Sequence, residues 1–216
     1  MPRTRTRLRR AVAALALGVL APTLTAVTTA PARAAQAAVP AALAAPGAPT
    51  AAAALDGTWR KLNITMQQQQ QTNWCWAASG NTIATFYGYG YSQNQFCNAA
   101  FGRSVNSSCP NSQATLGDVQ NGLSWIGINP GSYVTGYLRY TTVQTEVDAN
   151  RPIETRIQWS SGGGHMHVVY GYDTANNWVY WGDPWPSNYR YNWADYWYYV
   201  NNSSFSWTHS LYRIGA

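Results

Sequence analysis

One of the three cysteines, Cys75, stands at the start of a helical pattern in this chain of 216 residues. A thiol acts as a nucleophile only as its thiolate, and a helix N-terminus or a neighbouring imidazolium favours that form. Apolar side chains recur at helical spacing from Trp76 to Phe86, so Cys75 is expected in the first turn, where the macrodipole favours negative charge. The alternative for a cysteine in this position is a small buried apolar residue.

A cysteine nucleophile needs a base, and the chain has histidines only at positions 165, 167 and 209. His165 follows Gly162–Gly164 and opens an apolar strand, which suits an imidazole at the edge of a cleft. His167 has the same strand parity and is the rival base. His209 lies in the last strand pattern and is expected to have only a packing or surface role.

The second ring nitrogen of the base needs an acceptor that fixes its tautomer and direction. The histidine strand and the next strand are expected to form a hairpin around Asn176–Asn177. Asp183 ends the second strand and is expected to meet His165 across the ladder. The alternative is an ordinary carboxylate in an Asp-Pro turn.

Acyl transfer also needs a donor for the oxyanion of the tetrahedral intermediate. The five glutamines of Gln67–Gln71 lie just before Cys75 and supply side-chain amides. A solvated polar stretch is the alternative for such a run, and spacing alone does not choose among the five.

The other two cysteines, Cys97 and Cys109, lie twelve positions apart in a stretch that reads as a loop. The simplest assignment is one disulfide between them and one free, reactive Cys75. Three buried free thiols are the alternative. Neither CxxC nor HxxxH spacing is present, so we expect no metal and no cofactor.

The order of the expected elements places helices before strands. Helices are predicted over 74–90, 114–128 and 141–150, and strands over 153–159, 165–173, 177–183 and 204–215. This order indicates an α+β fold with an N-terminal helical half packed on a C-terminal antiparallel sheet.

The N-terminal part of the chain is unlike a folded domain. Residues 1–34 join an arginine-rich start, a short apolar run and an Ala-x-Ala site, which is the pattern of a secretory signal peptide. Residues 35–55 are nearly all Ala, Pro and Thr, so they predict a linker or pro-segment. Residues 56–216 are expected to form one domain, exported to the extracellular space.

The basic charge of the chain belongs mainly to that signal. Six of the 14 lysines and arginines lie in residues 1–34, whereas all eight acidic residues lie after position 55. The mature chain therefore has eight basic and eight acidic residues. This balance argues against a nucleic-acid partner and against a charged attachment to membranes.

The stretch from Gln71 to Ser79, the Gly-Gly-His segment at His165 and the Gly-Asp-Pro at Asp183 together resemble the papain-like cysteine peptidases. The similarity is greatest to compact bacterial members, namely secreted effector peptidases and the peptidase domains of peptide-exporting transporters. It covers residues 56 to about 186. The spacing of the family selects His165, six residues before Gly171, and Gln69, six before Cys75.

The resemblance implies a secreted peptidase with Cys75, His165, Asp183 and Gln69 in its catalytic site and a protein or peptide as substrate. We expect it to act as a monomer. The spacing from Cys75 to His165 is shorter than in plant-type members, His167 has no family role, and the region from Tyr189 onward carries no known motif. Two alternatives stay open: an amidase, deamidase or transglutaminase with the same fold, or a non-catalytic module that binds carbohydrate or cell wall through its many Trp and Tyr residues. We expect most of these aromatic side chains to fill the core and the faces of the sheet.

Overall fold

The computed structural model describes residues 59–216. The predicted signal peptide at 1–34 and the linker or pro-segment at 35–55 lie outside the described residues. Over the range 59–216, no helix combines the length and the apolar character needed to cross a membrane.

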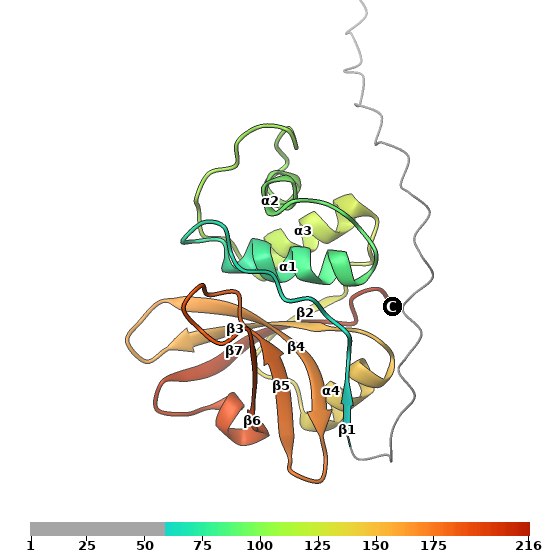
Figure 1. Ribbon diagram of the computed structural model, residues 1–216, viewed down its shortest axis with the longest axis vertical. Coiled ribbons are helices and arrows are strands. Elements are labelled where there is room, and N and C mark those ends of the chain that lie inside the picture. The colour runs from blue at the N-terminus through green and yellow to red at the C-terminus, as the bar shows by residue number, and fades with distance from the viewer. Residues whose placement is uncertain (1–58) are drawn as a thin grey trace, which may run out of the picture. The chain divides into compact units, whose positions relative to one another are not determined.

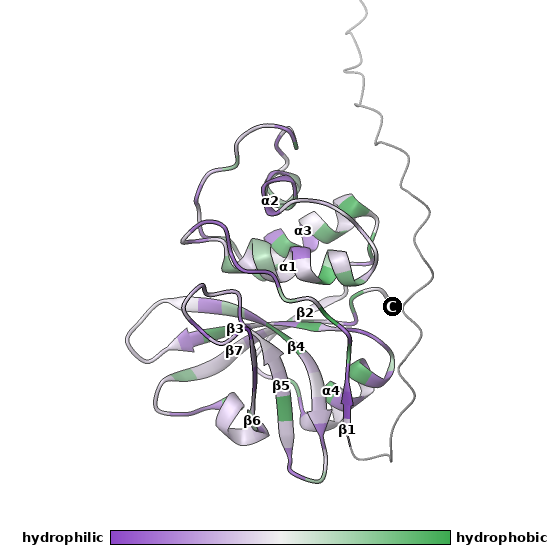
Figure 2. Ribbon diagram, viewed as in Figure 1, coloured by the Kyte–Doolittle hydropathy of each residue, from purple (hydrophilic) through white to green (hydrophobic). Residues whose placement is uncertain are grey.

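Three helices lie together on one side of the sheet (Figure 1). They are α1 (Cys75–Phe86), α2 (Gln93–Ala100) and α3 (Leu116–Ile126). The helices predicted over 74–90 and 114–128 are confirmed as α1 and α3, and both carry strongly apolar stretches in Figure 2. The α3 helix ends at Gly127, whose φ of 94° favours glycine.

The α2 helix corrects the sequence interpretation, which placed Cys97 in a loop. The side chain of Ser92 accepts from the Gln95 backbone, and the side chain of Gln95 accepts from the Ser92 backbone. This capping box starts the helix in a stretch whose composition favours turns. Burial of Phe96 and Cys97 then holds its inner face.

The described strands form a single antiparallel sheet, with the order β2-β7-β3-β4-β5-β6 and with β1 beside one end of β4. The strands are β1 (Trp59–Lys61), β2 (Ser132–Thr135), β3 (Ile153–Trp159), β4 (Gly164–Asp173), β5 (Trp178–Gly182), β6 (Tyr191–Asp195) and β7 (Phe205–Tyr212). All four predicted strands are present, and the β4–β5 turn contains Asn177 with a φ of 56°. The α+β class is confirmed.

Some elements of the sheet half were not foreseen. The predicted helix at 141–150 is α4 (Tyr140–Asp148), but α5 (Tyr196–Val200), β1, β2 and β6 had no recognised signal. The α5 helix begins where the side chain of Asp195 accepts from the backbone N–H groups of Trp197 and Tyr198. Of these elements, β2 and β6 form the two edges of the sheet, on either side of the strands that carry His165 and Asp183.

Helices α1, α2 and α3 pack together around one aromatic ring, that of Phe96. Phe96 of α2 is fully buried against Gly80 of α1 and Gly122 of α3. A Cβ atom would lie 2.5 Å from the Phe96 ring at position 80 and 2.8 Å from it at position 122. The two glycines therefore form the notch that receives the ring.

We expect Gly122→Ala to lower the free energy of unfolding by about 1–3 kcal/mol, because the added methyl overlaps a buried ring that cannot move. Urea denaturation measures this change. The control is Gly117→Ala at the exposed start of α3, where a Cβ would meet only Thr115 Oγ1, at 3.4 Å. Alanine has the higher helix propensity, so this variant should gain up to about 1 kcal/mol. Equal effects of the two substitutions would contradict the notch.

Candidate active site

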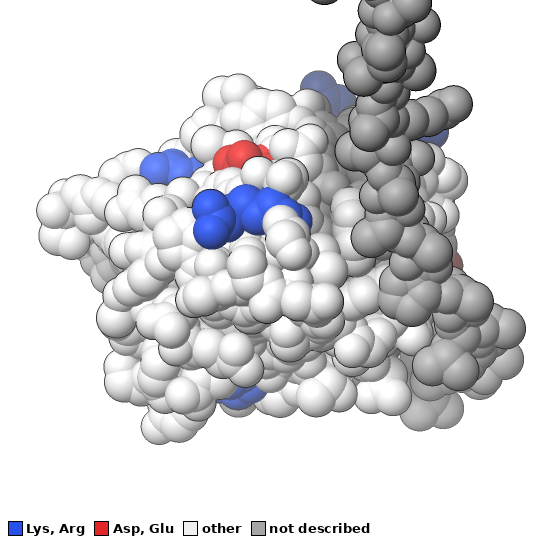
Figure 3. All heavy atoms as spheres, turned by 90° about the horizontal axis from the view of Figure 1, so that it is seen from above, with Lys and Arg blue, Asp and Glu red and all other residues white. Residues whose placement is uncertain are grey.

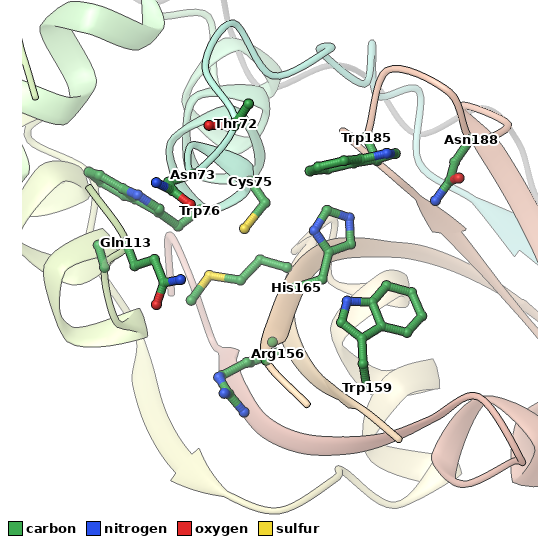
Figure 4. A pocket seen from close by; sticks show the side chains of 14 residues that line it. Thr72, Asn73, Cys75, Trp76, Gln113, Arg156, Trp159, His165, Trp185 and Asn188 are labelled. Carbon is green, nitrogen blue, oxygen red and sulfur yellow. The ribbon is translucent and has the colours of Figure 1, made fainter. Parts of the chain in front are cut away.

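Cys75 is the first residue of α1, as the sequence predicted, and its side chain is partly exposed. Its neighbour Trp74 provides no side-chain cap, so the first N–H groups of α1 are available to an anion. Figure 4 shows the Sγ atom pointing into a pocket beside the His165 ring. Both the position and the exposure of this thiol suit a nucleophile.

Hydrogen bonds to a distant segment hold the residues that flank Cys75. The indole N–H of Trp74 donates to Pro110 O and that of Trp76 donates to Ser112 O, each at 3.0 Å. Asn73 adds two bonds of 2.9 Å to Asn111. The anchoring segment 110–112 directly follows Cys109, which forms the predicted disulfide with Cys97. Cys75 is the free cysteine of the described chain.

His165 lies near the start of β4, between Cys75 and Asp183. Its Nε2 atom is 2.7 Å from Asp183 Oδ1. The Cys75 side chain lies beside the same ring (Figure 4). Because Nε2 faces Asp183, Nδ1 is the nitrogen left for Cys75. Burial lowers the pKa of His165, but the interactions with Asp183 and Cys75 outweigh it and raise the pKa from 6.5 to about 9. The ring therefore carries a proton at neutral pH.

Asp183 follows β5. It is both the acceptor for the His165 ring and the carboxylate of an Asp-Pro turn, the two alternatives that the sequence left open. Its Oδ1 atom accepts from the Trp185 backbone N–H at 2.8 Å, which is the Asp-Pro turn bond, and Oδ2 accepts from the Asn188 side chain at 2.8 Å. Burial alone would raise the pKa of Asp183, but the hydrogen bond to His165 and the contact with the His167 ring lower it well below 3.8. The carboxylate is thus ionised and fixed in direction.

The rival base His167 is buried on the far side of Asp183. The β4–β5 register pairs Val168 with Gly182, so Asp183 extends to face His167 and reaches His165 diagonally. His167 Nε2 is 3.4 Å from Asp183 Oδ2 but is not aligned for a hydrogen bond, while Nδ1 is 3.2 Å from the Tyr199 hydroxyl. Burial lowers the pKa of His167. It does not line the pocket, so it cannot reach a substrate there.

Gln69, the predicted oxyanion donor, is buried beside the segment that leads to Cys75. Its Nε2 donates to Gln71 O and Thr72 O at 2.9 Å each, and its Oε1 has no hydrogen-bond partner. Gln69 is not among the residues that line the pocket. Its catalytic role therefore stays a prediction. Cys75 itself lines the pocket, and its backbone N–H at the start of α1 is a second candidate donor.

The pocket around Cys75 and His165 has a volume of about 500 Å³. Trp159 stacks on the His165 ring with centroids 5.9 Å apart, and Trp185 meets it edge-on at 6.0 Å. In Figure 4, Trp185 and Asn188 lie on one side of the Cys75–His165 pair, and Arg156 and Gln113 lie on the other. The lining residues are Thr72, Asn73, Cys75, Trp76, Gln113, Ala114, Arg156, Trp159, Gly163, Gly164, His165, Met166, Trp185 and Asn188.

Sequence reasoning missed Glu154, a buried carboxyl group near Cys75. It lies on β3 between Val168 of β4 and Leu211 of β7, is fully buried, and neither of its carboxyl oxygens has a hydrogen-bond partner in the described structure. Burial, and the negative charge of Cys75 nearby, raise the pKa of Glu154 well above 4.5. No sequence signal marked this position, because the strand pattern does not show that both faces of β3 are covered.

Three buried side chains of the site could also supply ligands to a metal ion. His165, His167 and Asp183 each offer one ligand atom, and these atoms lie within 4.8 Å of one another. The expectation of no metal used only short sequence spacings and did not consider groups brought together across a hairpin. Since His165 and Asp183 are joined by a hydrogen bond here, a metal would compete with that bond. Measurements of activity therefore need a chelator.

The aromatic residues of the C-terminal region divide between core and surface. Five Trp and Tyr residues after position 177 are buried: Tyr180, Trp181, Tyr196, Tyr199 and Trp207. Six others are exposed: Trp185, Tyr189, Tyr191, Trp193, Trp197 and Tyr198. Of these six, Tyr191 and Trp193 lie on strand β6, so they belong to a face of the sheet. Among the six exposed side chains, Trp185 alone lines the pocket.

The face in Figure 3 carries few charged side chains on a mostly uncharged surface. It shows no broad basic patch of the kind that binds nucleic acid.

Glu154 leads to a prediction about stability and pH. Below pH 4.5 the group is protonated in both the folded and the unfolded chain. Above that pH the unfolded chain loses the proton and the folded chain keeps it, so the wild type loses stability by at most about 1.4 kcal/mol per pH unit. Glu154→Gln has no such proton. We expect its free energy of unfolding to match the wild type near pH 4 and to exceed it as the pH rises above 5, measured by urea denaturation.

The matched control is Glu146→Gln. Glu146 is also buried, but its carboxylate binds the Arg151 side chain at 2.7 and 3.0 Å and accepts from the Arg213 backbone. This variant should be less stable than the wild type throughout the same pH range. A similar loss in Glu154→Gln at pH 7 would mean that Glu154 is charged and paired in solution.

Comparison with known proteins assigns the sequence to a family. The sequence profile of the family described as "Papain-like cysteine protease AvrRpt2" matches residues 58–201. No curated protein matches. Among solved structures, the peptidase domain of Streptococcus ComA, a bi-functional ABC transporter involved in a quorum sensing pathway, is similar with a TM-score of 0.49 and 18% identity, covering 70% of this chain and 97% of that chain. A double glycine motif protease from an AMS/PCAT transporter, solved with its leader peptide, has a TM-score of 0.44 and 16% identity, covering 70% and 92%.

Because the profile matches more than half of the sequence, the chain belongs to the family of the papain-like cysteine protease AvrRpt2 and is a hydrolase of the cysteine protease class.

Proposed function

We propose that this protein is a secreted peptidase that hydrolyses peptide bonds through Cys75, His165 and Asp183 and an acyl-enzyme intermediate. One observation carries the proposal: the side chains of Cys75 and His165 lie next to each other in the same pocket, and the His165 ring is hydrogen-bonded to the buried Asp183. Nucleophile, base and orienting acceptor thus stand in the order that such catalysis needs.

The proposed reaction begins from a Cys75 thiolate beside a protonated His165. The thiolate attacks the carbonyl carbon of a peptide bond, and the oxyanion is held by the Cys75 backbone N–H, with Gln69 as the predicted second donor. His165 gives its proton to the leaving amine when the C–N bond breaks, which leaves a thioester on Cys75. His165 then takes a proton from water as its oxygen attacks the thioester, the C–S bond breaks to release the acid, and the Cys75 thiolate beside protonated His165 is restored.

Export of the protein is part of the proposal and rests on two features. The N-terminal 34 residues have the signal-peptide pattern. The Cys97–Cys109 disulfide suits an oxidising compartment outside the cytoplasm. The substrate is a protein or peptide that crosses the pocket, and we expect no nucleic-acid or membrane partner.

A deamidase, an amidase or a transglutaminase would use the same thiolate and base. These activities differ from a peptidase in the leaving group or the acceptor, so product analysis separates them. A peptidase yields two shorter peptides with a new amine, whereas a deamidase releases ammonia from an intact chain. A transglutaminase joins the acyl group to an added amine.

The first test is alkylation of the purified protein with iodoacetamide from pH 5.5 to 8.5, in the presence of a chelator, with peptide mass spectrometry. An ordinary thiol reacts about a hundredfold or more slowly at pH 5.5 than at pH 8.5, because few molecules are thiolate. We expect Cys75 to change by less than about tenfold over this range, since protonated His165 stabilises its anion. In His165→Ala the rate should follow the profile of an ordinary thiol.

His209→Ala is the control, because His209 lies on β7 and does not line the pocket. It should keep the wild-type profile. If the wild type itself reacts as an ordinary thiol, and His165→Ala does not change it, then the arrangement of Cys75 and His165 is structural and the proposed mechanism is wrong.

A second test concerns Gln69. We expect Gln69→Ala to lower kcat on a peptide substrate by about tenfold to a thousandfold while the alkylation rate of Cys75 stays within about twofold, because alkylation forms no oxyanion. Gln70→Ala, with an exposed side chain, should leave both rates unchanged. A parallel fall of both rates in Gln69→Ala would mean that its bonds to Gln71 and Thr72 only hold the loop.

A further inference from the structure

Arg156 is a cation in the wall of the active-site pocket that no carboxylate of the described chain neutralises. It lies on β3, is half-buried, and takes part in none of the ion pairs formed by residues 59–216. Its Nη1 donates to Thr208 Oγ1 and its Nη2 donates to Gln158 Oε1, both at 3.0 Å. The charge is therefore held in place by neutral groups.

Gly164, next to His165, gives the guanidinium its place. A Cβ atom on Gly164 would lie 2.5 Å from Nη2, 2.7 Å from Cζ and 2.9 Å from Nε of Arg156. Three similar distances mean that the flat face of the guanidinium, rather than one edge, covers this glycine. Gly162 and Gly163 have positive φ values and Gly164 does not, so backbone conformation does not require glycine at 164. The close approach of the Arg156 guanidinium is what requires glycine at position 164.

The arrangement leaves the arginine able to bind an anion. A guanidinium has five N–H donors in a fork that matches a carboxylate, and two of them are used by Thr208 and Gln158. The pocket lining contains no Asp or Glu, and its only other ionisable side chains are Cys75 and His165. An incoming carboxylate would thus meet a fixed cation without repulsion from a neighbouring acid.

The position of Arg156 gives the pocket two different ends. In Figure 4 the Cys75–His165 pair separates the Arg156 and Gln113 end from the Trp185 and Asn188 end. A peptide whose scissile bond lies at Cys75 runs from one end to the other. A substrate side chain on only one side of the cleaved bond can therefore reach the guanidinium.

We propose that Arg156, placed by Gly164, is a specificity residue that binds a carboxylate of the substrate, so that the enzyme prefers an acidic residue at one position on one side of the cleaved bond. This inference rests on the proposed peptidase function. An Asp or Glu side chain or a free peptide C-terminus could supply the carboxylate.

The test is cleavage of internally quenched peptides in which each position around the cleaved bond is scanned with Glu, Gln and Lys, with C-terminally amidated and free-acid sets compared. We expect one position at which Glu is preferred over Gln. The ratio of kcat/KM for the Glu and Gln peptides should fall about tenfold to a hundredfold in Arg156→Gln, because a charge-assisted bidentate contact is lost. In Arg156→Glu the same position should prefer Lys. A preference confined to the free-acid set identifies the peptide terminus as the source.

Two further variants complete the test, one that displaces Arg156 and one control. Gly164→Ala retains the arginine but displaces its guanidinium, so the Glu-to-Gln ratio should fall here too, even if Arg156→Gln folds poorly. Arg139→Gln removes an exposed cation outside the pocket and should leave the ratio unchanged. Cleavage without an acidic preference, or with one that survives in both Arg156→Gln and Gly164→Ala, would overturn this inference alone. No cleavage of any peptide would overturn the peptidase proposal and the inference with it.

Discussion

The contact between His165 and Asp183 is the interaction on which the site depends, and the fold secures both partners. Asp183 stands just beyond β5, and its strand end is tied to the segment that leads into Cys75. Gln69 N–H donates to Pro184 O at 2.9 Å, and a Cβ on Gly182 would lie 2.6 Å from Met66 Sδ. The same packing therefore sets the position of the acceptor relative to the imidazole and relative to the thiol.

The helical layer fixes Cys75 from the other side. The disulfide ends at Cys109, and the next three residues bind the residues that flank the nucleophile. A disulfide that closes a loop of this length contributes about 3 kcal/mol in the chain-entropy model. It also brings the anchoring segment beside α2, which is packed against α1 through Phe96. The two tryptophans that flank Cys75 therefore have a structural role, because each donates its indole N–H to a backbone carbonyl of segment 110–112.

Much of the fold was predictable because strong periodicity marks α1, α3 and the four central strands. The elements that were missed depend on contacts far along the chain or on a cap. The α2 helix is started by Ser92 and Gln95 within a stretch of turn-like composition. The hairpin argument brought Asp183 to the histidine strand but placed it opposite His165, whereas the register sets it opposite His167. Arg156 and Glu154 were not recognised as parts of the site, because sequence alternation cannot show that both faces of β3 are covered.

The two buried carboxyl groups near the nucleophile show how the surroundings, rather than residue type, decide their charge. Asp183 accepts hydrogen bonds from Trp185, Asn188 and a protonated His165, so its negative charge is compensated at a short distance. Among residues 59–216 none donates a hydrogen bond to the Glu154 side chain, so its neutral acid form is favoured. If Glu154 were ionised as well, its charge would oppose the Cys75 thiolate with nothing to balance it. The proposed ion pair of Cys75 and His165 therefore requires one acid that is charged and one that is not, and the hydrogen-bond partners in the fold provide that difference.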